Sequence, residues 1–138
     1  MSYGTFTKQA ARYREAEVLS ASPAQLVVIV YEHLLVNLRR ARLLASEQDG
    51  MARSDALERA RAALTELLVT LDRDKGGELA NRLGSIYTFV LSELVVLGVK
   101  PDTKRMDAII ALVGELHEAF SQAAQSMVTP HSAAVAVS

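Results

Sequence analysis

The sequence has no cysteine and no tryptophan, and only 5% of its 138 residues are aromatic. The absence of cysteine excludes disulfide bonds, thiolate metal sites and cysteine nucleophiles. The N-terminal stretch MSYGTFTKQAARYRE is polar and lacks the apolar core of a secretory signal. No uninterrupted apolar run is longer than Leu26–Tyr31, whereas a membrane-spanning helix needs about 20 residues. We therefore expect a cytoplasmic protein.

An excess of charge of one sign is also lacking. The 15 basic residues are balanced by 16 acidic ones, which gives a formal net charge of −1. Such a balance provides no general attraction for nucleic acid or for an anionic membrane. The sequence also lacks a basic stripe interleaved with aromatic residues, a pattern that would favour nucleic-acid binding. Neither nucleic acid nor a membrane is expected as a partner.

Hydrophobic residues make up 50% of the sequence, and most of them are Ala, Leu and Val. Ala and Leu favour helix, and small side chains allow helices to pack closely. A chain of this length forms one domain and buries about two-thirds of the surface of its unfolded chain. These properties predict a single all-α domain.

Start and stop signals divide the chain into four long helices. Ser22 and Gln25 form a capping box around Pro23, which is a strong helix start. The later breaks are Asp49-Gly50, Lys75-Gly76-Gly77, Gly98 to Pro101, and Thr129-Pro130. The predicted helices span residues 23–47, 52–72, 78–97 and 103–127, and Asp102 is expected to cap the last one.

Within these segments, apolar residues recur at spacings of three and four, which is typical of helices that bury one face. In the third segment the expected inner face is Leu79, Leu83, Ile86, Val90, Leu94 and Leu97. In the fourth it is Met106, Ile109, Val113, Leu116, Phe120, Ala123 and Met127.

Long helices of similar length joined by short loops fold as an antiparallel up-down-up-down four-helix bundle. We expect that architecture for residues 22–127. An N-terminal arm or short extra helix would precede it (residues 1–21), and a flexible tail would follow it (residues 128–138).

Two of the predicted helices have apolar residues outside their inner faces. Ile29 and Val36 are seven residues apart, and so are Phe89 and Val96, which places each pair on the outward side of its helix. In one interpretation the N-terminal arm, including Tyr13, packs over these residues. In the other they form a hydrophobic groove for a partner helix. The two interpretations are compatible, because a partner can displace an arm.

No pattern typical of catalysis or metal binding is present. A di-iron site in a helix bundle needs Glu-x-x-His pairs. The residues three before His33, His117 and His131 are instead Val30, Gly114 and Val128. A phosphotransfer histidine needs exposure and basic or small neighbours, whereas His33 precedes two leucines and His117 precedes an acidic residue. We expect no metal, no cofactor and no enzymatic activity.

Four stretches of the chain form a further pattern. They are Tyr13 with Ala21-Ser22-Pro23; Gln25-Leu26 and Val30-Tyr31-Glu32, leading to Ala41; Leu71-Asp72 with Gly76-Gly77-Glu78-Leu79-Ala80; and Leu83, Ile86-Tyr87, Phe89 and Leu94. In this order, and with these helix lengths, the chain resembles the flagellar secretion chaperones of the FliS family over roughly residues 6–125.

The resemblance implies a cytoplasmic, cofactor-free export chaperone. Proteins of that family bind the C-terminal segment of flagellin, which is disordered before assembly. Binding prevents premature polymerisation in the cytosol and aids delivery to the flagellar type III export gate. The expected partner-binding residues are three tyrosines at family positions and the two outward pairs: Tyr13, Tyr31, Tyr87, Ile29, Val36, Phe89 and Val96. A purely structural role for Tyr31 and Tyr87 also fits.

Two alternatives to an export chaperone are a structural or regulatory bundle that self-associates through the same outward residues, and a phosphotransfer protein. The sequence is compatible with a monomer and with a dimer.

Overall fold

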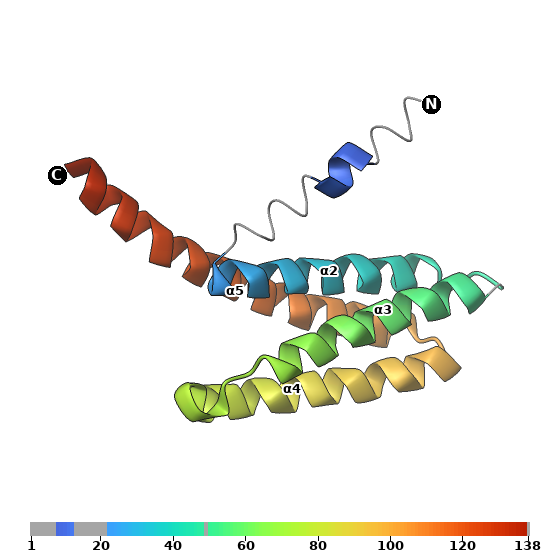
Figure 1. Ribbon diagram of the computed structural model, residues 1–138. Coiled ribbons are helices and arrows are strands. Elements are labelled where there is room, and N and C mark those ends of the chain that lie inside the picture. The colour runs from blue at the N-terminus through green and yellow to red at the C-terminus, as the bar shows by residue number, and fades with distance from the viewer. Residues whose placement is uncertain (1–7, 13–21, 49, 138) are drawn as a thin grey trace.

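The chain is helical throughout its long segments, and the part that the structure describes has no strand (Figure 1). The computed structural model describes residues 8–12, 22–48 and 50–137, with side chains up to Ser126. Its long helices are α2 (Pro23–Leu43), α3 (Gly50–Val69), α4 (Arg73–Val99) and α5 (Thr103–Val137). Residues 8–12 are also helical, and the rest of the predicted arm, with Tyr13, lies outside the described residues.

The four long helices alternate in direction along the bundle (Figure 1). α3 and α5 each pack closely against α2, and α4 packs most closely against α3. The end of α5 projects beyond the other helices, on the side where α2 begins. The all-α antiparallel bundle expected from the sequence is therefore confirmed.

α2 begins with the capping box that the sequence predicts. The Gln25 backbone N–H donates to the Ser22 hydroxyl at 3.2 Å, and the Ser22 N–H donates to the Gln25 side chain at 2.9 Å. Pro23 lies in the first turn, where its missing N–H leaves no hydrogen bond unmade. These interactions fix the position at which the chain enters the bundle.

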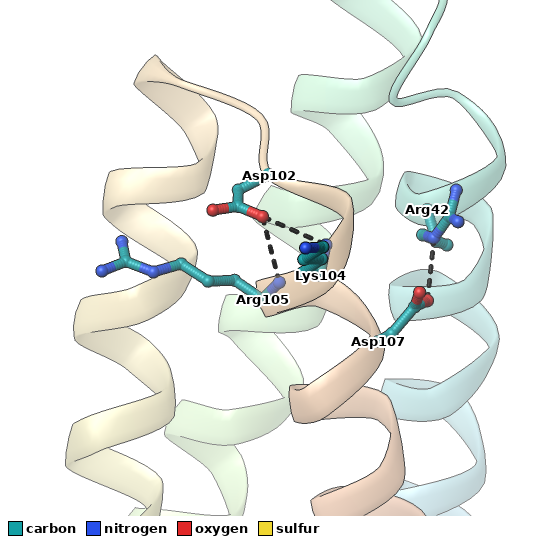
Figure 2. Close-up of polar contacts among 5 residues, drawn as sticks. All are labelled: Arg42, Asp102, Lys104, Arg105 and Asp107. Carbon is teal, nitrogen blue, oxygen red and sulfur yellow. Dashed lines mark hydrogen bonds and ion pairs between the residues drawn. The ribbon is translucent and has the colours of Figure 1, made fainter.

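At the opposite end of the bundle, Asp102 caps α5 as expected (Figure 2). Its Oδ1 accepts the backbone N–H groups of Lys104 (3.1 Å) and Arg105 (3.2 Å). Further along α5, Asp107 forms an ion pair with Arg42 of α2 at 2.8 Å. This pair joins the last turn of α2 to the start of α5.

The first and the last long helix end at other residues than predicted. The first long helix stops at Leu43 rather than at Glu47, and the chain then turns over residues 44–46. The last helix passes Pro130 and continues to Val137, so the prediction that this proline ends it is wrong. A proline removes one backbone hydrogen bond, but the Ala-rich residues beyond it favour helix.

α4 begins before the glycine pair that the sequence marks as a break. Asp72 caps the helix by accepting the N–H of Lys75 at 3.1 Å, and helical structure starts at Arg73. Gly77 then has φ 54° and ψ −128°, a positive φ that favours glycine. The predicted break is present, but it lies inside α4 and sets a short first turn apart from the rest of the helix.

The core contains one apolar face of each long helix. In α4 that face is Ala80, Leu83, Tyr87, Val90, Leu94 and Leu97, at spacings of three and four. The predicted face is wrong at Leu79, which is 63% exposed, because the regular spacing passes through the smaller Ala80. In α5, Ala124 is buried rather than Ala123, because the step from Phe120 along the buried face is four residues and not three. As a result, Tyr87 points into the bundle toward α2.

Candidate functional site

An apolar hollow of about 520 Å³ opens between the start of α2 and the end of α3. It is lined from α2 by Pro23, Leu26, Val27, Ile29, Val30 and His33, and from the end of α3 by Glu66, Leu67 and Thr70. Most of these side chains are apolar, so the hollow offers a hydrophobic surface at one end of the bundle.

A second hollow, of about 350 Å³, adjoins the first at the turn between α3 and α4. The two hollows share Val27, Leu67 and Thr70. The other lining residues of the second are Leu71, Asp72, Lys75, Gly76, Leu79, Ala80, Leu83, Tyr87 and Phe120. We call the two hollows together the end groove. All four long helices contribute to it.

Three aromatic side chains support the end groove from inside the bundle. Tyr87 and Phe120 line the second hollow, and Tyr31 of α2 is fully buried next to them. The Tyr31 and Tyr87 hydroxyls are hydrogen-bonded to each other. The Tyr31 ring stacks on Phe120, with ring centroids 5.2 Å apart and planes 26° apart. Because each hydroxyl is the partner of the other, both can be buried without an unsatisfied polar atom.

Burial raises the pKa of both tyrosines above the ordinary value of 10.0. For Tyr31, the hydrogen bond to Tyr87 and the charge on Tyr87 raise the pKa further. For Tyr87, the hydrogen bond with Tyr31 lowers the pKa and partly opposes the effect of burial. Both hydroxyls are therefore protonated at neutral pH, and the pair joins α2 to α4 as a neutral contact.

Polar side chains surround the apolar lining of the end groove. His33, Glu66, Thr70, Asp72 and Lys75 all line it and are all exposed. An apolar centre with a polar, solvent-accessible rim is typical of protein–protein interfaces. A groove of this kind suits an amphipathic segment whose apolar residues recur along one side.

Outside the end groove, one cluster has residue types that also occur in hydrolases. The Nε2 atom of His117 lies 3.4 Å from a Glu32 carboxylate oxygen and 3.4 Å from the Ser121 hydroxyl. In a catalytic triad the acid and the nucleophile contact different nitrogens of the imidazole. Both contacts here are to the same nitrogen, so the cluster lacks the arrangement that activates a serine.

The predicted partner-binding residues divide between the end groove and other surfaces. Ile29 and Tyr87 line the end groove, and Tyr31 lies in the core next to it. Val36, which is 60% exposed, lies on the outward side of α2. Ile29 and Val36 lie on one side of α2, two turns apart, and of the two only Ile29 lines the end groove.

Phe89 and Val96 lie on the outward side of α4. They are 56% and 46% exposed, and neither lines the end groove. The other predicted outward pair, Ile29 and Val36, lies on α2, and α2 and α4 are not closely packed neighbours. Phe89 and Val96 therefore form a second exposed apolar surface, separate from the end groove.

Several residues of the end groove are not among the predicted partner-binding residues. They include Val27, Leu67 and Thr70. A hollow of this kind is expected where the apolar residues on the inner face of one helix continue beyond the end of the neighbouring helix. Leu26-Val27 at the start of one helix and Leu67-Leu68 near the end of the next have that pattern.

Comparison with known proteins adds a family assignment. The family model described as "Flagellar protein FliS" matches residues 6–127. The chain is 31% identical over 109 residues to the flagellar secretion chaperone FliS of Salmonella typhimurium, covering 78% of this chain and 81% of that protein. The protein of the same name from Campylobacter jejuni is 29% identical over 110 residues, covering 80% and 86% of the two chains. That of Bacillus subtilis is 28% identical over 114 residues, covering 83% and 84%.

A solved structure has the same fold. A crystal structure described as a flagellar chaperone from bacteria superposes with a TM-score of 0.70. The superposition covers 87% of this chain and 98% of that one, at 19% sequence identity. The helical arrangement is therefore shared over nearly the whole length of that chain.

Proposed function

Because the chain belongs to the FliS family of flagellar proteins, we propose that it is an export chaperone that binds the disordered C-terminal segment of flagellin. The relatives are named flagellar secretion chaperones, and a chaperone has a client protein. The single observation that supports a client site best is the end groove, an apolar surface with a polar rim.

The physical role of the end groove is to mask the apolar side of the client. A terminal segment that assembles into a filament has an apolar face that would otherwise pair with another flagellin. A disordered segment that folds on binding loses several kcal/mol of gross interaction energy to ordering. Wide apolar contact is needed to offset this, and the two hollows, of about 520 and 350 Å³, provide it.

The place of each predicted partner-binding residue in the structure decides which part of the client it is proposed to contact. Ile29 and Tyr87 contact the client in the end groove, while Tyr31 keeps Tyr87 in place. Val36 contacts a part of the client that extends along the outside of α2. Tyr13 contacts the client from the segment that precedes Ser22 in the sequence, and Pro23, the first residue of α2, lines the end groove.

The exposed pair on α4 adds a second contact surface. Phe89 and Val96 would be reached by a client segment long enough to continue beyond the end groove. The chaperone acts in the cytoplasm without a cofactor or catalytic activity. It keeps flagellin unassembled and presents it to the flagellar type III export apparatus.

A polymerisation assay tests this function. Purified flagellin is seeded with filament fragments, and the polymer is measured by sedimentation with and without an equimolar amount of this protein. We expect polymer formation to fall at least tenfold, because the masked terminal segment cannot join the filament. Flagellin that polymerises equally well in the presence of excess chaperone would contradict the proposal.

A further inference from the structure

The two hollows of the end groove differ in the charged side chains that line them. Among the described residues, the larger hollow is lined by one carboxylate, that of Glu66, and by no lysine or arginine. The second hollow is lined by one lysine, Lys75, and by one carboxylate, that of Asp72. Glu66 lines only the larger hollow, and Lys75 lines only the second. The end groove therefore presents an acidic and a basic side chain at separate places on its rim.

The charges of Glu66 and Lys75 are not compensated within the bundle. In the described part of the chain, neither residue forms an ion pair, and His33 on the α2 side of the larger hollow forms none with Glu66. Other charged residues near this end do pair, as Arg82 does with Glu78 at 2.7 Å. Glu66 and Lys75 are both exposed, so water solvates their charges while the end groove is empty.

The carboxylate of Asp72 is in a different situation. It accepts the backbone N–H of Lys75 at 3.1 Å as the N-cap of α4, so the start of that helix already compensates its charge. Arg73 and Asp74, in the same turn, carry opposite charges and do not line the second hollow. Glu66 and Lys75 are therefore the charges of the rim that remain for a client.

The helix dipoles do not decide the sign of the charge that each hollow prefers. α2 begins and α3 ends at the end of the bundle that carries the larger hollow (Figure 1). The positive end of one dipole and the negative end of the other therefore oppose each other. At the second hollow α3 ends and α4 begins, with the same result. The preference for charge at each hollow comes from the side chains.

We propose that Glu66 and Lys75 select the charge pattern of the client segment. A lysine or arginine borders the apolar face of the client at the larger hollow, and an aspartate or glutamate borders it at the second. The apolar residues of the client contact Ile29 and Leu67 inside the larger hollow, while its charged residues stay at the rim. This inference rests on the proposed function, because both charges belong to the proposed client site.

The physical reason is the loss of water when the client binds. A charge that is desolvated without a partner opposes binding, so the client has to supply a partner for each of the two. Complementary charges at a rim add specificity, because a segment with like charges at the same places is rejected. Since Glu66 and Lys75 have opposite signs, a client inserted in the reverse direction would bring like charges together. The pair therefore fixes the direction in which the client lies along the end groove.

Fluorescence anisotropy with the labelled C-terminal segment of flagellin tests each charge separately. Glu66→Lys and Lys75→Glu should each weaken binding at least fivefold, because each replaces an attraction by a repulsion. Glu58→Lys and Lys100→Glu are the matched controls, since they change exposed residues of the same two types that do not line the end groove. Each control should change the affinity less than about twofold. Circular dichroism establishes that all four variants fold.

Compensating changes in the client identify the residues that pair with the rim. Each lysine or arginine of the labelled segment is changed to glutamate, and each acidic residue to lysine, one at a time. One change of the first kind should restore binding to Glu66→Lys, and one of the second kind should restore binding to Lys75→Glu, to within about twofold of the wild-type affinity. Neither change should improve binding to the Glu58→Lys control.

The outcomes separate this inference from the proposed function. If the wild-type protein binds the segment and neither Glu66→Lys nor Lys75→Glu weakens binding more than the controls do, the inference is overturned and the chaperone function stands. A loss of affinity that no client substitution restores overturns the inference as well. A wild-type protein that does not bind the segment would contradict the proposed function, and the inference with it.

Discussion

Replacing Tyr31 with alanine is expected to lower the free energy of unfolding by about 3–5 kcal/mol. The side chain is fully buried between Tyr87 and Phe120, so its removal leaves a cavity in the core and ends the stacking on Phe120. It also leaves the Tyr87 hydroxyl without its partner. Urea unfolding followed by circular dichroism measures the change, and a loss below about 1 kcal/mol would show that this part of the core is not close-packed.

Phenylalanine variants separate the hydrogen bond from the packing. Tyr31→Phe and Tyr87→Phe should each cost about 1–3 kcal/mol, because each leaves one buried hydroxyl unsatisfied. The double variant should cost less than the sum of the two, because both hydroxyls are then absent. Equal and additive effects would mean that the two hydroxyls are not coupled.

The same pair predicts a dependence of stability on alkaline pH. Folding raises the pKa of both hydroxyls above the ordinary value of 10.0, so the unfolded chain ionises at lower pH than the folded one. Their contribution to stability is fully present below pH about 10 and is lost as the pH rises above it. The double phenylalanine variant should lose less stability than the wild type between pH about 9 and about 11.

Replacing Ile29 with aspartate should weaken binding of the flagellin C-terminal segment at least tenfold, which is about 1.4 kcal/mol or more. Ile29 is half-buried and lines the larger hollow of the end groove. A carboxylate there would be desolvated by the client without a cation to pair with it. Fluorescence anisotropy with a labelled segment measures the affinity, and thermal unfolding checks that the bundle is intact.

Val69→Asp provides the matched control for Ile29. Val69 is exposed and apolar, and it lies on α3 close to the end groove but does not line it. The control should bind the client like the wild type. If both variants bind equally well, the end groove is the wrong surface. Phe89→Asp in the same assay then shows whether the client also contacts the outward side of α4.

Local sequence signals predicted the ends of several helices because the interactions that form them are local. Ser22 bonds to Gln25, three residues away, and Asp102 bonds to the backbone of Lys104 and Arg105. Such pairs can be recognised without knowing where the rest of the chain lies.

The phase of a helix was harder to predict where a small residue competes with a large one. The buried face of α4 passes through Ala80 and Tyr87, whereas apolar size alone favoured Leu79 and Ile86. A strict alternation of spacings of four and three from Leu83 through Leu97 would have selected the observed face. The helix beyond Pro130 was missed because proline is a frequent, but not an obligatory, helix stop.

The candidate site depends on contacts between distant parts of the chain, and this limits prediction. Tyr31 and Tyr87 are 56 residues apart, and their hydrogen bond places Tyr87 at the floor of the end groove. Val27 and Leu67 meet only because α2 and α3 pack side by side. The sequence identified Ile29 and Phe89 as apolar and outward, but not that they belong to separate surfaces.

The most direct measurement is a calorimetric titration of this protein with flagellin from its own organism, both full-length and without the C-terminal segment. The account predicts binding of full-length flagellin with a negative heat-capacity change, because apolar surface is buried when the segment orders. It predicts no binding of the truncated form. Equal binding of the two forms, or no binding of either, would contradict a chaperone that masks the C-terminal segment of flagellin.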